Sequence, residues 1–244
     1  MDGPPARRAA PGRRRGRTDT MAADWPGSVV RRNTLRRQIA DALRDEVLAG
    51  RLPCGHRFTV KEIAEQYGVS ATPVREALLD LCAQGLLDIE EHRGFMVRAF
   101  TAEDYRAMVE ARTLVVEGIF RGPGARMPRP PDEDLLSLRR RAEEAERAAR
   151  AGDLDVLIGY DLRFWRELGG LVGNAYIREF LDRLRVQTWM FAVPLLRERD
   201  ELRGLLWQGH RSLAEAVARH DPAEAQRLIA EYNAHALTLV GTPG

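Results

Sequence analysis

The sequence predicts a mainly α-helical protein, with a small N-terminal unit of three helices and a hairpin followed by an all-helical bundle of about six helices. Apolar residues recur at helical spacing along most of the chain. Strand-like apolar runs occur in one place only, between residues 86 and 97. Hydrophobic residues make up 44% of the 244 residues, which is enough to build the cores of two domains of ordinary size.

The first two helices are marked by caps and an apolar stripe. The first is predicted from Thr34 to Ala49, and Gly50 ends it. A loop through Pro53 and Gly55 leads to a short second helix, which Thr59 can cap. The apolar stripe of the first helix consists of Leu35, Ile39, Leu43 and Val47.

The segment from Gly68 to Leu78 has the composition of a helix-turn-helix turn followed by a recognition helix. Gly68 can adopt the left-handed conformation that ends a helix. Ser70 or Thr72 can cap the next helix, and Pro73 suits its first turn. In this interpretation, the exposed start of the helix presents hydrogen-bond donors to DNA. The alternative interpretation is a capped helix with no role in DNA binding, as in any small domain. These donors are Ser70, Thr72 and Arg75.

A hairpin follows the third helix, which is expected to end at about Gln84. Residues 86–89 predict one strand, residues 91–94 a turn, and residues 95–97 a returning strand. Three helices and a two-stranded hairpin make a winged helix-turn-helix, whose third helix enters the major groove while the hairpin tip lies near the DNA backbone. The candidate DNA contacts are Lys61, Ser70, Thr72 and Arg75 on the helices and His92, Arg93 and Gly94 in the wing.

The second half of the chain predicts long helices without a strand signal, and therefore an all-helical bundle. The chain accordingly divides into a tail (1–30), a winged helix-turn-helix domain (31–100) and a helical domain (101–241). The helices of the bundle are expected near 102–121, 131–151, 153–171, 174–194, 198–219 and 221–240.

Residues 1–30 form an Arg-rich tail that is expected to be disordered, because its Pro, Gly, Ala and Arg residues cannot bury a core. In one interpretation, the arginines of the tail add salt-dependent affinity for DNA phosphates. In the other, the protein begins at Met21 and the preceding residues are not part of it. It lacks the apolar core of a secretory signal. The chain also has no apolar run long enough to span a bilayer, and its two cysteines lack metal-ligand spacing, so we expect a cytoplasmic protein.

Residues 34–97 resemble the DNA-binding domain of GntR-family bacterial transcription regulators. Cys54 stands where the family usually has proline, and Ala71 where it usually has an arginine that reaches DNA. Loss of a bidentate contact to a base lowers the binding free energy by ~1–3 kcal/mol. We therefore expect either that the operator differs from the family's usual one or that other residues compensate for the lost contact. The matching segments are Leu48–Pro53, Glu62–Ala64, Gly68–Ser70, Thr72–Leu78, Gly85–Leu86 and Arg93–Gly94.

Residues 101–240 resemble the C-terminal ligand-binding domain of the FadR subfamily, called the FCD domain. The resemblance implies a homodimer that binds a small organic acid. The segments that carry it are Glu110–Arg112 with Glu117, Asp161–Trp165 with Gly173-Asn174, and His210–Ala216 with Asp221 and Ala225.

Many members of that subfamily hold a divalent metal with one Asp and three His. This chain keeps Asp161 and His210, but Trp165 and Tyr232 stand where two other ligands would be. We therefore favour a buried hydrogen-bonded pair, or direct contacts to an effector, over a metal site. The alternative is a metal held by Asp161, His210 and His235, which lies one helical turn beyond Tyr232.

Arg112 is the candidate anchor for an organic acid, because a guanidinium pairs bidentately with a carboxylate. The alternative is an interhelical ion pair with Glu110, Glu117 or Asp161. We expect Trp189, Met190 and Phe191 in the core or on a dimer surface, whereas Arg163 and Gln187 could line the effector cavity. The candidate effector-binding residues are Arg112, Asp161, Trp165, Asn174, His210 and Tyr232.

The resemblance implies a homodimeric transcription regulator, most often a repressor, that binds a palindromic DNA operator under the control of an organic acid. No residue cluster supplies a nucleophile or general base at motif spacing, so we do not expect an enzyme. Two alternatives stay open. One is a metal-dependent enzyme fused to a winged helix, and the other is a DNA-binding protein without an effector, its pocket closed by Trp165 and Tyr232.

Overall fold

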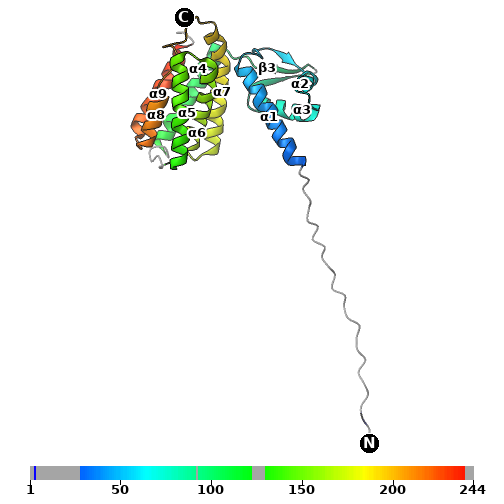
Figure 1. The fold of residues 1–244 in the computed structure, drawn as a ribbon, viewed down its shortest axis with the longest axis horizontal. Coiled ribbons are helices and arrows are strands. Elements are labelled where there is room, and N and C mark those ends of the chain that lie inside the picture. The colour runs from blue at the N-terminus through cyan, green and yellow to red at the C-terminus, as the bar shows by residue number, and fades with distance from the viewer. Residues whose placement is uncertain (1–2, 4–27, 92, 123–129, 240–244) are drawn as a thin grey trace.

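The computed structural model describes residue 3 and residues 28–91, 93–122 and 130–239. The N-terminal unit lies beside an upright helical bundle (Figure 1). It contains α1 (Ser28–Leu48), β1 (Arg57–Phe58), α2 (Val60–Tyr67), α3 (Ala71–Ala83), β2 (Leu87–Glu90) and β3 (Gly94–Val97). The bundle contains α4 (Ala102–Arg121), α5 (Asp132–Ala151), α6 (Leu154–Gly170), α7 (Ala175–Arg197), α8 (His210–Ala218) and α9 (Pro222–Thr238). The predicted fold class, a winged helix-turn-helix followed by a helical bundle, is confirmed.

The sheet of the N-terminal unit is antiparallel and has the strand order β1-β3-β2. The predicted hairpin is β2 and β3, with Ile89 opposite Phe95. The prediction of a two-stranded sheet is wrong, because β1 adds a third strand that pairs Phe58 with Phe95. A two-residue strand is too short to show an alternating pattern, so the sequence carried no signal for it.

Two predicted helix boundaries are wrong. Helix α1 begins at Ser28 and not at Thr34, so residues 28–30 belong to a helix and not to a disordered tail. The nearest helix-breaking residues before it are Pro26 and Gly27, and the capping preference of Thr34 does not interrupt the helix. Apart from residue 3 and residues 28–30, the predicted tail lies outside the described residues.

The predicted helix at 198–219 forms only in its second half, as α8. Helix α7 continues past Pro194 to Arg197, and a non-helical segment follows until His210. Leu206 and Trp207 in this segment are both buried. Gly204 in this segment has φ +76°, a left-handed conformation that does not continue a right-handed helix.

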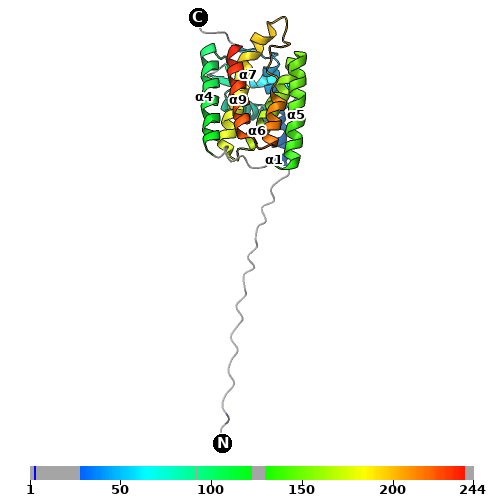
Figure 2. The same ribbon diagram turned by 90° about the vertical axis from the view of Figure 1, so that its left-hand side faces the viewer.

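Within the bundle, α4 and α5 lie on opposite sides, with α6, α7 and α9 between them (Figure 2). Among the described helices, none combines the length and the apolar character that a membrane crossing requires.

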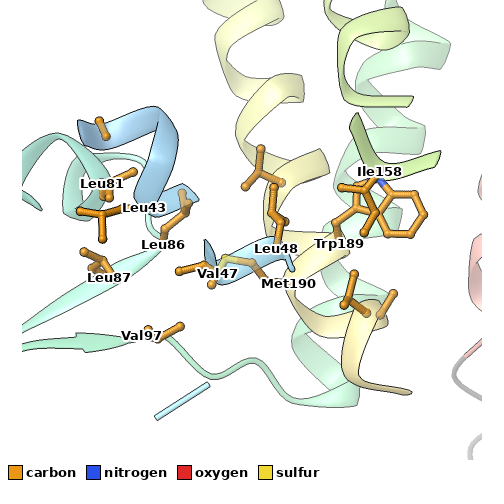
Figure 3. Close-up of a cluster of buried hydrophobic side chains, with 14 of the residues drawn as sticks. Leu43, Val47, Leu48, Leu81, Leu86, Leu87, Val97, Ile158, Trp189 and Met190 are labelled. Atoms are coloured by element: carbon orange, nitrogen blue, oxygen red, sulfur yellow. The ribbon is translucent and has the colours of Figure 1, made fainter. Parts of the chain in front are cut away.

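Helix α7 joins the bundle to the N-terminal unit through a shared core. Leu48 of α1 and Met190 of α7 are buried in the same hydrophobic cluster, which also contains residues of α3, β2 and β3 (Figure 3). The side-chain amide of Gln187 donates hydrogen bonds to the carbonyl oxygens of Gln84 and Gly85, at 3.2 and 3.4 Å. The turn that ends α3 is therefore attached directly to α7.

Candidate functional site

The turn between α2 and α3 is built by local caps. The Thr59 hydroxyl accepts a hydrogen bond from the Glu62 backbone N–H, and the Thr59 N–H donates to the Glu62 carboxylate, as in a capping box. Gly68 has φ +63° and ends α2 in the left-handed conformation, as predicted. Ser70 occupies the N-cap position of α3, but its side chain makes no capping hydrogen bond. The expectation that Ser70 or Thr72 caps α3 through its side chain is therefore wrong, and the exposed Ser70 hydroxyl is not used for capping.

The exposed side of this turn carries four of the residues predicted to contact DNA: Lys61, Ser70, Thr72 and Arg75. Lys61 and Arg75 border the same open hollow, between α2, α3 and the sheet. The opposite face of α3 enters the core through Val74, Ala77, Leu78 and Leu81. The helix therefore presents a polar, cationic start to solvent while its apolar face fixes its orientation.

The wing brings Arg93 to the surface and holds Gly94 against β1. Gly94 has φ +95°, and a Cβ atom there would lie 2.5 Å from the carbonyl oxygen of Phe58. Glycine is therefore required at this position by the close approach of the β1 backbone. His92, also predicted as a wing contact, lies outside the described residues.

Replacement of Gly94 by alanine is expected to lower the free energy of unfolding by about 1–3 kcal/mol, because the backbone of Phe58 cannot rotate aside as a side chain can. Gly55→Ala is the matched control, since Gly55 also has a positive φ (+77°) but nothing lies within 4 Å of its Cβ position. Urea denaturation of both variants measures the difference. Equal losses in the two variants would show that the contact with Phe58 is unimportant.

A second group of polar residues lies buried in the bundle around Asp161 of α6. The indole N–H groups of Trp165 and Trp189 donate to its two carboxylate oxygens, each at 2.8 Å. His210 Nε2 lies 3.0 Å from Oδ1. Burial alone would raise the pKa of Asp161, but the hydrogen bond with His210 and the charge of Arg185 outweigh it, so the pKa is lowered. Asp161 is therefore an ionised carboxylate surrounded by donors.

Two buried arginines face the same aromatic ring. Arg112 of α4 and Arg185 of α7 are 1% and 5% exposed, and their Cζ atoms lie 4.9 and 5.1 Å from the centre of the Tyr232 ring. Among the described residues, Nε and Nη2 of Arg112 and Nη1 of Arg185 have no hydrogen-bond partner. Burial, followed by the like charge of Arg185, lowers the pKa of Arg112 to about 10. The buried carboxylate of Asp161 thus interacts with both guanidinium groups, and the partly exposed carboxylate of Asp182 interacts with Arg185.

Arg112, Asp161 and Tyr232 border a cavity of about 40 Å³. Unpartnered donors and acceptors face the same region, including Nδ1 of His210 and Nε1 of Trp207. Because buried polar atoms are normally hydrogen-bonded, their concentration here makes this cavity a candidate binding site. The cavity has room for a small polar group such as a carboxylate.

The structure brings together five of the six predicted effector-binding residues: Arg112, Asp161, Trp165, His210 and Tyr232. It does not bring Asn174 to them. Asn174 is exposed and caps α7, where its side chain accepts from the backbone N–H groups of Tyr176 and Ile177. Arg163 is also exposed, stacked on Tyr160, and Gln187 faces the N-terminal unit.

Two residues of the cluster, Arg185 and Trp189, were not predicted to belong to it. Trp189 was expected in the core or on a dimer surface, and it is buried, but its indole N–H binds Asp161. Arg185 lies in a mixed stretch of α7, near Arg183 and Gln187, so no sequence signal distinguishes it; only its burial does. Its spacing of four residues from Trp189 places both side chains on one face of the helix.

The metal site suggested by the FadR resemblance does not fit these residues. Trp165 can only donate a hydrogen bond, and it occupies an oxygen of Asp161 that a metal would need. His235 hydrogen-bonds with the backbone of Leu205, and its Nε2 has no partner among the described residues. In the described part of the chain, no group of three or more His, Cys, Asp or Glu side chains could hold a metal ion. The alternative set Asp161, His210 and His235 therefore finds no support among the described residues.

Comparison with known families gives two matches that follow each other along the chain. The description "Bacterial regulatory proteins, gntR family" matches residues 35–97, and "FCD domain" matches residues 125–235. The first range covers the helix-turn-helix and the wing. The second covers α5 to α8 and most of α9, which include Asp161, Arg185 and His210.

Named relatives support the same assignment. The chain is 29% identical over 201 residues to the "Probable D-xylose utilization operon transcriptional repressor" of Paenarthrobacter nicotinovorans, which covers 82% of this chain and 86% of the relative. It is 32% identical over 149 residues to an HTH-type transcriptional regulator from the TAR-I ttuE-ttuC' intergenic region of Agrobacterium vitis, covering 61% and 84%. The solved structure of E. coli McbR/YncC has the same fold, with a TM-score of 0.70 at 22% identity over 84% of this chain and 96% of that one.

Proposed function

The chain belongs to the GntR family of bacterial regulatory proteins and carries an FCD domain, and from this premise we propose that it is a homodimeric repressor of the FadR subfamily, released from its operator by a small organic acid. Like its relatives, the chain is a transcriptional regulator and not an enzyme. The name of the Paenarthrobacter nicotinovorans relative supports repression. The proposal places the protein in the cytoplasm, where bacterial DNA lies.

The exposed start of α3 supports binding to the major groove. Ser70, Thr72 and Arg75 follow one another on its solvent side, and Lys61 stands beside them at the start of α2. In a helix-turn-helix, the N-terminal residues of the second helix contact base edges while neighbouring cations contact phosphates. The exposure of Arg93 in the wing supports a contact between its side chain and the DNA backbone. Two copies related by two-fold symmetry would require two operator half-sites.

The single observation that supports control by an acid is the pair of buried arginines at Tyr232, with unpartnered guanidinium nitrogens. Two like charges buried with one carboxylate leave a net positive charge in a medium of low dielectric constant. A carboxylate ligand would supply both the missing charge and a bidentate acceptor. The proposed site therefore consists of Arg112, Asp161, Trp165, His210 and Tyr232, now with Arg185 and Trp189.

Helix α7 is the proposed link between this site and the DNA-binding unit. Arg185 and Trp189 face the polar cluster, whereas Gln187 binds the turn that ends α3. A ligand that moves α7 would therefore act on the placement of the helix-turn-helix. It releases DNA only if it binds the DNA-incompetent arrangement better, and a coupling of about 1–3 kcal/mol changes operator affinity by about 5–150-fold.

An electrophoretic shift assay tests the proposal, with purified full-length protein on DNA upstream of its own gene and a panel of organic acids. We expect a retarded band that resists nonspecific competitor DNA and that one of the acids abolishes. A specific band that no acid alters would contradict effector control. If nonspecific competitor DNA removes the retarded band completely, the result would contradict specific binding to this upstream region.

Arg112→Met is expected to raise the free energy of unfolding by about 1 kcal/mol or more, because it removes an uncompensated buried charge. The same variant should no longer respond to the acid that releases the wild-type protein. Thermal denaturation and the shift assay measure the two effects. Arg140→Met, on the exposed side of α5, is the matched control and should change neither. A loss of stability in Arg112→Met would instead assign Arg112 a structural role.

A further inference from the structure

A second, larger cavity lies in the bundle next to the polar cluster. Its volume is about 230 Å³, and side chains of α4, α6, α7, α8 and α9 line it. The lining is almost entirely apolar and includes Val116, Phe120, Leu168, Leu213 and Ile229. A cavity of about 150 Å³ with comparable lining admits a benzene molecule, so this one admits a larger apolar body.

Arg185 gives the apolar cavity a charged end. Its guanidinium borders the cavity and lies 3.9 Å from the centre of the Trp165 ring, which forms a wall shared with the polar cluster. The side chain is 95% buried, and Nη1 has no hydrogen-bond partner in the described part of the chain. An unpartnered, buried guanidinium donor beside an apolar cavity matches a ligand with a carboxylate at one end.

Asp182 is the other charged residue at this cavity, and its charge acts on Arg166 and, less strongly, on Arg185. Its carboxylate is partly exposed and lies 3.4 Å from the guanidinium of Arg166, with which it forms an ion pair. Arg166 is therefore the main partner of Asp182, and Nη1 of Arg185 donates no hydrogen bond to it.

We propose that the apolar cavity binds the hydrophobic body of an amphiphilic monocarboxylate, with its carboxylate on Arg185. The inference rests on the proposed function, since it names the class of acid that controls the regulator. A medium-chain alkanoate or an arylalkanoate has the required shape, whereas short acids such as acetate lack the apolar body. Trp165 in place of a metal ligand is consistent with this class, because its ring supplies apolar surface to the cavity.

Isothermal titration calorimetry of the full-length protein with octanoate tests the proposal. Acetate, which lacks the apolar body, and 1-octanol, which lacks the charge, are the control ligands. We expect octanoate to bind about tenfold or more tightly than either, because a hydrogen-bonded charge and a buried chain both contribute. Arg185→Met should remove the preference for octanoate over octanol. Equal affinity for all three ligands, or no binding of octanoate and 3-phenylpropionate, would overturn the proposal.

A cavity-filling variant keeps the test independent of Arg185, whose loss affects the polar cluster. Val116→Phe places a ring in the cavity and should weaken octanoate binding about tenfold or more, while Val156→Phe, on the exposed side of α6, should not. Octanoate binding that Val116→Phe leaves unchanged would overturn the proposal. The shift assay separates this inference from the proposed function. If only a short acid releases the protein from the operator, the result contradicts this inference but not the proposed function. If octanoate binds but does not release the protein from the operator, the result supports the ligand cavity and contradicts effector control.

Discussion

Replacement of Arg75 by alanine is expected to weaken binding to the specific operator by about 5–150-fold, which corresponds to ~1–3 kcal/mol. Arg75 is exposed in the first turns of α3, and it borders the hollow that Lys61 also borders. The arginine that usually precedes this part of the GntR turn is replaced by Ala71, whose side chain cannot form hydrogen bonds. We therefore expect Arg75 to carry a larger share of base recognition than it would with two arginines present.

Fluorescence anisotropy with labelled operator and with scrambled DNA of equal length measures this effect. Arg75→Ala should lose affinity for the operator much more than for scrambled DNA, because phosphate contacts remain. Arg140→Ala removes the same charge from the exposed side of α5 and is the matched control. Unchanged operator affinity in Arg75→Ala, with a normal melting temperature, would exclude Arg75 from the specific contacts.

Asp161→Ala is expected to lower the free energy of unfolding by about 3–5 kcal/mol, because it removes a fully buried acidic partner of the two arginines and leaves buried donors unpaired. The carboxylate accepts from Trp165, Trp189 and His210, which come from α6, α7 and α8. Its loss therefore affects the packing of three helices at once.

Urea denaturation monitored by tryptophan fluorescence and by circular dichroism measures this loss. Asp155→Ala is the control on the same helix, since Asp155 is 68% exposed and pairs with Arg197 at the surface, and it should cost less than about 1 kcal/mol. Asp161→Asn should remain destabilised, because an amide offers one acceptor oxygen where the carboxylate offers two. Similar stability of Asp161→Ala and Asp155→Ala would show that the cluster does not stabilise the bundle.

The turn of the helix-turn-helix was predictable because its signals are local. Thr59 and Glu62 satisfy each other's backbone within four residues, and Gly68 ends α2 through its own conformation. No distant residue has to be known for either prediction. The same reasoning failed at Thr34, because a good capping residue can also lie inside a helix.

The segment before α8 was mispredicted because its apolar residues fit a helical pattern equally well. Leu206 and Trp207 are buried by contacts with other helices, and only the assembled bundle determines that both must point inward. Asn174 illustrates the converse. Its place in an ordered family motif suggested a ligand contact, but its amide caps α7. Capping and ligand binding both use an amide, so residue type does not distinguish them.

The polar cluster was predicted in part because the FCD resemblance marked Asp161 and His210, while Arg185 and Trp189 carried no motif. Their role depends on which face of α7 meets α6, and periodicity alone does not determine this. The net positive charge of the cluster, on which the proposed acid site rests, became evident only when Arg112 and Arg185 were both placed against Tyr232.

Selection of bound duplexes from random DNA by the purified full-length protein tests the central claim most directly, because it does not require the operator's position to be known. The account predicts enrichment of a short palindrome whose two half-sites bind one dimer, with loss of enrichment in Arg75→Ala. Enrichment of no sequence by the wild-type protein, or of the same palindrome by Arg75→Ala, would contradict recognition of DNA through the start of α3.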